Sequence, residues 1–236
     1  HMFTFESVVR FSETDAQEKL PLPGIINYFQ DCSEFHSESL GSGAGTLGNY
    51  AWILSSWQIQ LKRYPKRSET ITIATKPHSF KGIEGQRNFL IQDSTGDVIV
   101  NANSIWSYFD MEKQRPARIT QDQYDCYKLE EAYPMDYAPR KIDLKDIAED
   151  SWECLHRITV HPSMLDMFGH MNNSQYATIG CDALPKQYEF HQVRIEYKKS
   201  ALLEDEVVVR RAILEDRLVI RLDDKKNSTY AVLEFC

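Results

Sequence analysis

The chain has 236 residues, enough for one large domain or two small ones with a packed core. Hydrophobic residues make up 42% and charged residues 26%, which are the fractions of a folded globular chain and exclude wholesale disorder. The net charge of -8 argues against non-specific nucleic-acid binding, because that binding depends on neutralising phosphates. No apolar run approaches the ~20 residues of a membrane-spanning helix.

The opening HMFTF has neither a basic start nor a long apolar stretch, so we expect no signal peptide. His1-Met2 reads as a cloning remnant.

The five cysteines are odd in number, widely spaced and without a CxxC pair. They predict reduced thiols in the cytoplasm rather than a disulfide framework or a zinc site.

The first 120 residues predict one strand, one helix and then a run of antiparallel strands. Residues 3–11 alternate towards apolar side chains, as a strand does. Apolar residues then recur at steps of three and four and predict a helix with Pro23 in its first turn and Gly41 at its end. Strand-like runs follow at residues 52–61, 70–75, 87–92 and 98–109.

The same order of elements returns in the second half. Residues 121–150 are rich in charge and contain two prolines, so they predict a linker with short helical pieces. A strand at 152–160 and a helix from Met171 to about Ala183 come next, before further strands at residues 193–197, 207–211, 218–222 and 230–235. The repeat predicts two modules, at residues 3–120 and 151–236, of the α+β class.

Residues 165–176 hold the densest group of polar side chains. Asp166, His170, Asn172 and Asn173 fall at a predicted loop-to-helix junction, where free N–H groups and the helix dipole can hold an oxyanion. Asp166 could act as a general base or a nucleophile, and His170 could orient it or donate to the carbonyl or the leaving group. Alternatively, the aspartate and asparagines only cap the helix and His170 is a packed core residue.

The pattern D-x-x-G-H-x-N-N-x-x-Y, from Asp166 to Tyr176, resembles the signature of hotdog-fold thioesterases. With the tandem repeat, the length and the linker, the whole chain resembles the acyl-acyl-carrier-protein (acyl-ACP) thioesterases of plants and bacteria, which end fatty acid synthesis. Segments 11–15, 22–31 and 194–199 support this resemblance. It implies a double hotdog in which two long helices are each wrapped by an antiparallel sheet.

The resemblance also implies an activity: hydrolysis of acyl-ACP thioesters to free fatty acid and carrier protein, without metal or cofactor. The implied partner is an acyl carrier protein with a pantetheine-linked acyl chain, and we expect a monomer or a homodimer. The N-terminal module is expected to hold the acyl chain and the C-terminal module to carry the catalytic motif. The alternatives are an acyl-CoA thioesterase and a non-catalytic acyl-binding protein.

In that family the site resembles D-x-N-x-H, with a Glu, often beside a Cys, on the strand after the helix. Asp166 and His170 match the first and last residues of the motif. Phe168 stands at the Asn position, and Ser200-Ala201 stands at the Glu-Cys position. A phenylalanine side chain cannot hydrogen-bond to water or a carbonyl, and Ser200 lacks a carboxylate's charge. These departures motivate the non-catalytic alternative.

Three further sets of residues are candidates for binding roles. The N–H groups at the helix start could hold an oxyanion, at Gly169, Met171 and Asn172. Aromatic side chains of the first half either line an acyl pocket or form plain core, at Trp52, Trp57, Phe80 and Trp106. A basic cluster either docks an acidic carrier protein or is a solvated edge, at Lys62, Arg63, Lys66 and Arg67.

Asp15 is a second carboxylate of interest. Residues 11–17 resemble the start of single-hotdog acyl-CoA thioesterases, in which an Asp here can attack or activate water. The Gly-His and Asn-Asn of that motif are absent. We therefore expect Asp15 to be a carboxylate at the approach to a helix in a degenerate half, with a role in the reaction as the alternative.

Overall fold

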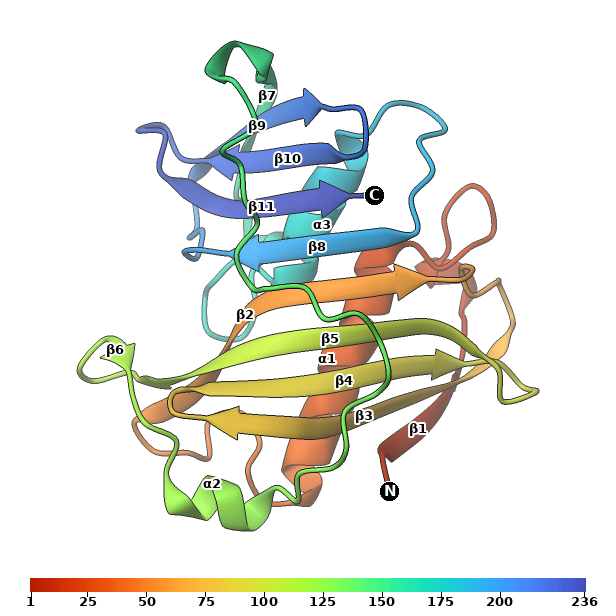
Figure 1. Ribbon diagram of the computed structural model, residues 1–236, viewed down its shortest axis with the longest axis vertical. Helices are drawn as coiled ribbons and strands as arrows, with labels where there is room; N and C mark the ends of the chain where they lie inside the picture. Colours follow the sequence, from red (N-terminus) through yellow and green to blue (C-terminus); the bar gives the residue numbers. More distant parts are fainter. The chain divides into compact units, whose positions relative to one another are not determined.

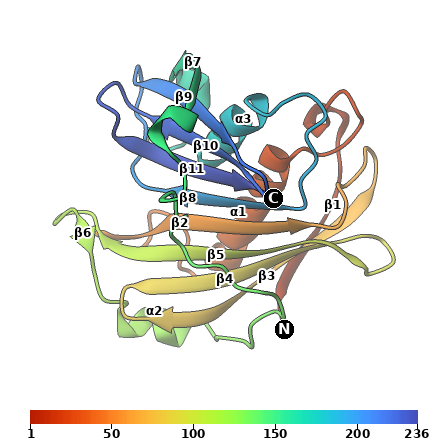
Figure 2. The ribbon, with the colours of Figure 1, turned by 45° about the horizontal axis from the view of Figure 1, so that its top comes forward.

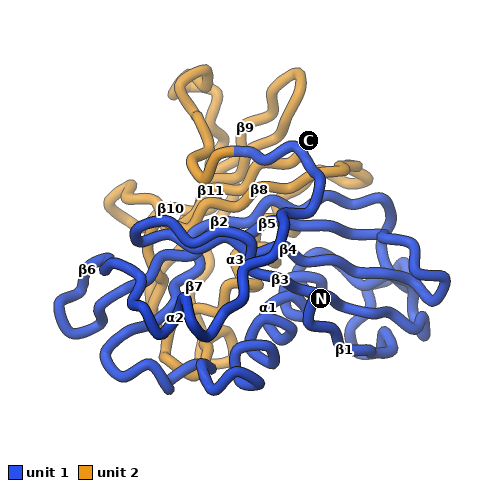
Figure 3. Tube along the Cα trace, turned by 60° about the horizontal axis from the view of Figure 1, so that its bottom comes forward, with its two compact units in different colours: residues 1–138 blue, residues 139–236 orange.

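The chain divides between Ala138 and Pro139 into two units, in a computed structural model that describes residues 1–236 (Figure 3). We call residues 1–138 unit 1 and residues 139–236 unit 2. The division falls inside the segment 121–150 that the sequence predicts as a linker. None of the helices has the combination of length and hydropathy that a bilayer crossing requires.

Unit 1 is an antiparallel sheet with a long helix on one face (Figure 1). Its strands lie in the order β1-β3-β4-β5-β2, and β6 pairs with β5. The elements are β1 (Phe3–Val8), η1 (Phe11–Glu13), α1 (Leu22–Ser39), β2 (Tyr50–Leu61), β3 (Thr70–Lys81), β4 (Glu84–Gln92), β5 (Val98–Asp110), β6 (Arg115–Pro116) and α2 (Gln121–Cys126).

Helix α1 packs on this sheet through one apolar side, because its hydrophobic residues return every three or four positions. Ile25, Phe29 and Cys32 on that side are completely buried. The ring centroid of Phe29 lies 5.8 Å from that of Trp57 on β2 and 5.0 Å from that of Phe89 on β4. Aromatic packing between helix and sheet therefore forms the centre of the unit 1 core.

Unit 2 repeats the arrangement with fewer residues. Its strands lie in the order β8-β11-β10-β9-β7. Helix α3 packs on one face of this sheet, as Figures 1 and 2 show, and a Cβ at Gly180 would lie 2.6 Å from Cδ2 of Leu233 on β11. The elements are η2 (Glu149–Ser151), β7 (Glu153–Thr159), η3 (Pro162–Met164), α3 (Asn173–Asp182), β8 (Gln192–Tyr197), β9 (Glu206–Ile213), β10 (Leu218–Asp223) and β11 (Thr229–Phe235).

The predicted order of elements is confirmed in both halves, with two differences in length. The strand predicted at residues 70–75 continues to Lys81, because a register shift between Pro77 and Ser79 accommodates a residue without an amide hydrogen. Helix α3 has ten residues, so it is shorter than α1 and than the helix expected from Met171 to about Ala183. The chain leaves the helix at Ala183, two residues before Pro185.

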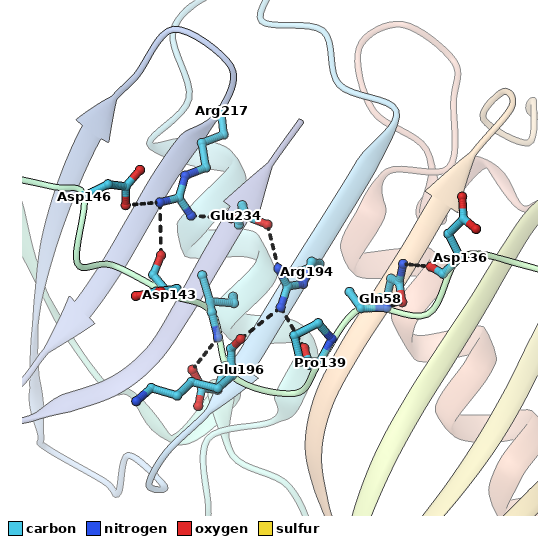
Figure 4. Close-up of polar contacts among 12 residues, drawn as sticks. Gln58, Asp136, Pro139, Asp143, Asp146, Arg194, Glu196, Arg217 and Glu234 are labelled. Carbon is cyan, nitrogen blue, oxygen red and sulfur yellow. Dashed lines mark hydrogen bonds and ion pairs between the residues drawn. The ribbon is translucent and has the colours of Figure 1, made fainter.

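The end of unit 1 lies along the face of its sheet opposite α1. Gln58 follows Trp57 on β2, so its side chain points to that opposite face. Gln58 Nε2 donates to the carbonyl of Asp136 at 2.8 Å, and Gln58 Oε1 accepts from the N–H of Ala138 at 2.9 Å (Figure 4). These residues of the predicted linker are therefore attached to the sheet and do not form a free spacer.

The start of unit 2 is attached to its own sheet in the same way. Arg194 on β8 donates to the carbonyls of Pro139 at 2.7 Å and Lys141 at 3.1 Å, and Glu196 accepts the N–H of Ile142 at 3.1 Å. A small hydrophobic cluster adds to these bonds and contains Ile142, Ile147, Ala212, Val219 and Val232. Residues 139–147 are thus held by both polar and apolar contacts.

A buried carboxylate, Glu234 on β11, organises these contacts. Its oxygens accept from Arg194 at 3.1 Å and from Arg217 at 2.5 Å, and Arg217 also donates to the carbonyl of Asp143 and the carboxylate of Asp146 (Figure 4). The Glu234 side chain is only 7% exposed. Because these side chains are largely removed from water, loss of the Glu234 carboxylate would leave the two guanidinium groups without a counter-charge.

We expect Glu234→Gln to destabilise the protein by about 3 kcal/mol, because two partly buried guanidinium groups lose their shared counter-charge. The urea midpoint at neutral pH measures the effect. Glu206→Gln is the matched control, since its pairs with Arg157 and Lys225 are at the surface. Equal shifts for the two variants would contradict the role assigned to Glu234.

Candidate active site

Asp166 closes a tight turn that leads into α3. Its N–H donates to the carbonyl of His170 at 2.7 Å, and its carbonyl accepts from Gly169 at 3.1 Å. Its Oδ1 accepts from the N–H groups of Phe168 at 2.9 Å and His170 at 3.1 Å. Gly169 has φ +77°, which glycine adopts without strain. The turn therefore fixes the carboxylate and leaves Oδ2 without an intramolecular partner.

The asparagine that precedes α3 is its N-cap, as predicted. Asn172 Oδ1 accepts from the N–H of Ser174 at 3.1 Å and from its hydroxyl at 3.2 Å. These bonds satisfy a donor at the helix start that has no partner within the helix. The cap therefore orients the first turn of α3 directly after the Asp166 turn.

The N–H groups predicted to hold an oxyanion are already in use. Gly169 donates to Asp166 at 3.1 Å, Met171 to the carbonyl of Ala201 at 2.9 Å, and Asn172 to a carbonyl upstream at 2.9 Å. None of the three is available to an oxyanion in this structure, which corrects the prediction. The imidazole of half-buried His170 remains as a donor beside Asp166.

The loop that follows β8 lies against this turn. His170 and Leu202 form an isolated β-bridge, and the N–H of Met171 bonds to Ala201 in the same loop. Ser200 is exposed at the start of this contact, and the Phe168 side chain is 58% exposed. The structure thus brings the two residues that depart from the family motif into the same region as Asp166 and His170. No cluster of three or more His, Cys, Asp or Glu side chains forms a metal-ligand set.

Unit 1 contains the same turn, bond for bond. Asp15 Oδ1 accepts from the N–H groups of Gln17 at 2.8 Å and Lys19 at 3.1 Å, and the Asp15 N–H donates to the Lys19 carbonyl at 2.9 Å. Glu18, with φ +60°, takes the place of Gly169. This equivalence was missed from the sequence, although both aspartates stand the same number of residues before their helices. Lysine replaces histidine in the unit 1 turn.

The four aromatic candidates do not form one cluster: Trp57 lies in the core, and only Trp52 and Phe80 stack on one another. Trp57 is 1% exposed, and Trp52 stacks on Phe80 with ring centroids 5.3 Å apart. Trp106 donates its indole N–H to Ser104 at 2.7 Å. A cavity of about 370 Å³ near α2 and one of about 520 Å³ between β1 and α1 lie in unit 1, and none of the four lines either. These two cavities therefore give no support to an acyl pocket lined by the four aromatic residues.

A buried cation makes part of the unit 1 core polar. Arg87 on β4 is buried and donates to Nδ1 of His36 at 3.0 Å and to Thr75 at 3.2 Å, and it has no carboxylate partner. Burial and the neighbouring guanidinium lower the pKa of His36 to about 4, which keeps the imidazole a neutral acceptor. The C-terminal half of α1, which contains His36, therefore packs against a buried polar group as well as apolar ones.

Two members of the basic cluster already have carboxylate partners. Arg63 donates to both oxygens of Glu69, at 2.5 and 3.0 Å, and Arg67 forms an ion pair with an exposed glutamate. The other two members of the cluster, Lys62 and Lys66, are exposed and have no ion-pair partner. Any attraction of an acidic partner by this cluster therefore depends most on the two lysines.

Comparison with known proteins identifies the family and the fold. The model of the acyl-ACP thioesterase N-terminal domain matches residues 1–127, and that of the C-terminal domain matches residues 147–234. An oleoyl-acyl carrier protein thioesterase, chloroplastic, from Coriandrum sativum is 25% identical over 224 residues, which are 85% of this chain and 59% of that protein. The chain spans about half to three-fifths of the length of the curated relatives it matches.

Two solved structures share the fold. An acyl-ACP thioesterase from Bacteroides thetaiotaomicron matches with a TM-score of 0.89 at 21% identity, over 99% of this chain and 96% of that chain. The 12:0-ACP thioesterase from Umbellularia californica matches with a TM-score of 0.86 at 15% identity, over the same shares. The fold is thus the expected α+β double hotdog. Because the family models match both halves, the chain belongs to the acyl-ACP thioesterase family.

Proposed function

We propose that this chain hydrolyses acyl-ACP thioesters to free fatty acid and carrier protein. The observation that carries the proposal is the fixed carboxylate of Asp166, which has one oxygen bound by two N–H groups and the other unbound, beside His170. Membership of the family and relatives named as oleoyl- and palmitoyl-ACP thioesterases support the substrate class.

The geometry supports general-base hydrolysis. Water attacks the thioester carbonyl while Oδ2 of Asp166 accepts a proton from it. The tetrahedral intermediate then breaks its C–S bond, and the proton taken up by Asp166 passes through the His170 imidazole to the departing pantetheine thiolate, so both side chains return to their starting states. The two N–H bonds at Oδ1 fix the direction of the carboxylate, which is the positioning that such a step needs.

We propose that unit 1 holds the acyl chain and unit 2 performs the chemistry. The lysine in the Asp15 turn supports this division, since unit 1 lacks the histidine of the other turn. The aromatic core formed by Phe29, Trp57 and Phe89 offers the apolar surface for the chain. All five cysteines are free, which supports a reducing compartment such as the cytoplasm. We also propose that the protein acts as a monomer or a homodimer.

Asp166→Asn tests the proposed base directly. An asparagine oxygen can still accept both N–H groups and keep the turn, but it cannot take the proton. We expect kcat/KM for thiol release from medium- and long-chain acyl-ACPs to fall by about 10²–10⁴-fold. Asp15→Asn, in the equivalent turn of unit 1, is the matched control and should leave the rate unchanged. The reverse pattern would overturn the assignment of chemistry to unit 2.

The carrier is tested by replacing Lys62 and Lys66 together with alanine. We expect kcat/KM for acyl-ACP to fall by about tenfold at low salt, because steering of an acidic carrier weakens, and by less at high salt. The matching acyl-CoA should react at the wild-type rate. Arg63 is left in place because its loss would leave Glu69 without its partner. An equal loss on both substrates would exclude a carrier-specific docking role.

The two departures from the motif favour a second candidate function, acyl-ACP binding without turnover. Phe168→Asn with Ser200→Glu is expected to raise kcat at least about tenfold by restoring a hydrogen-bonding group and a carboxylate. Both side chains are exposed, so the exchange should cost little stability. Tight acyl-ACP binding by an inactive wild type, with turnover in the double variant, would establish the binding function. An active wild type with no gain would exclude it.

A further inference from the structure

We propose that Tyr176 is a positioning residue for this reaction: its hydroxyl oxygen binds the N–H of Ala201 and so holds the loop of residues 198–205 against the start of α3. The inference rests on the proposed function, because this loop carries Ser200 to the Asp166 turn.

The Ala201 residue is bound on both of its polar groups. Its N–H donates to Oη of Tyr176 at 2.9 Å, and its carbonyl accepts from the N–H of Met171 at 2.9 Å. Ala201 is completely buried, and Tyr176 is 2% exposed. A buried N–H without an acceptor is costly, so loss of the hydroxyl would favour movement of the loop away from α3.

The equivalent loop residue of unit 1 needs no tyrosine hydroxyl as an acceptor. Leu20 donates its N–H to the carbonyl of Pro65, as Met171 does to Ala201. Proline has no N–H, so no acceptor is needed at this place. The residue that follows Asp15 by as many positions as Tyr176 follows Asp166 is Ile25, which is completely buried and has no hydroxyl. The hydroxyl therefore occurs in the unit whose loop has an N–H to satisfy.

The hydroxyl acts by position and not by proton transfer. Burial, and to a smaller degree the nearby carboxylates of Asp166 and Asp205, raise the pKa of Tyr176 to about 12. The group therefore stays neutral across the range in which the enzyme works. The neutral hydroxyl oxygen accepts from Ala201 through a lone pair, so no ionised form is needed for the bond.

The loop matters because of what it carries to His170. Ser200 directly precedes Ala201, and Leu202, which directly follows it, bridges to His170. In unit 1, Lys19 takes the place of His170, and Tyr64 takes the place of Ser200. These two side chains are in contact, since Nζ of Lys19 lies 5.6 Å from the ring centroid of Tyr64. A displaced loop alters the surroundings of the reacting groups, so the chemical step should suffer more than acyl-carrier binding.

The test compares Tyr176→Phe with the double variant Tyr176→Phe/Ala201→Pro, well below the melting temperature. Tyr176→Phe should lower kcat for acyl-ACP at least about tenfold with little change in KM. The double variant removes the unpaired N–H as unit 1 does, so it should fold even if the single variant does not, and it should recover most of the lost kcat. Failure of the folded double variant to recover kcat would overturn the proposal.

Tyr188→Phe is the control, because it removes a partly buried hydroxyl that bonds to the backbone away from this loop, where it donates to the carbonyl of Phe235. It should leave kcat unchanged. Amide hydrogen exchange of residues 198–205 gives a readout independent of activity and should accelerate only in Tyr176→Phe. If the wild type has no thioesterase activity, the proposed function fails, while exchange still reports whether Tyr176 holds the loop. Unchanged exchange would overturn the positioning role in either case.

Discussion

The structure of both units depends on one carboxylate oxygen that accepts two backbone N–H groups before a helix. In unit 2 this oxygen belongs to Asp166 and in unit 1 to Asp15, and the surrounding bonds agree within a few tenths of an ångström. A charge-assisted bond of this kind fixes a short turn more firmly than neutral side chains do. The turn then sets the direction of the helix and brings the next loop into contact with it.

The two aspartate turns share their backbone hydrogen bonds but differ in their side chains. At the position after the positive-φ residue, unit 1 has Lys19 and unit 2 has His170. The tip of the turn is polar in unit 1, whereas unit 2 exposes Met167 to 80% and Phe168 to 58% of their surface. The backbone geometry gives both aspartates the same bonds, and the side chains distinguish the two turns, because the histidine of unit 2 can act as an acid or a base near neutral pH.

The linker has a structural role that its composition conceals. A segment rich in charge and proline normally stays solvated, yet residues 139–147 are attached to the sheet of unit 2 through Arg194 and Glu196. Glu234 makes this possible, because it neutralises Arg194 and Arg217 where neither is well solvated. Charges that suggest a flexible tether in the sequence are thus used to hold the segment in place.

The sequence by itself determined the order of elements and the repeat, because these follow from local periodicity, and the resemblance of its motifs indicated the family and the candidate pair Asp166 and His170. Only the tertiary structure decided which N–H groups are free, that Trp52 packs on Phe80 and lines neither cavity, and that Ala201 meets Tyr176. The physical reason is that a donor is used up, or an aromatic ring buried, by partners distant in the chain. Such partners leave no trace in the spacing of neighbouring residues.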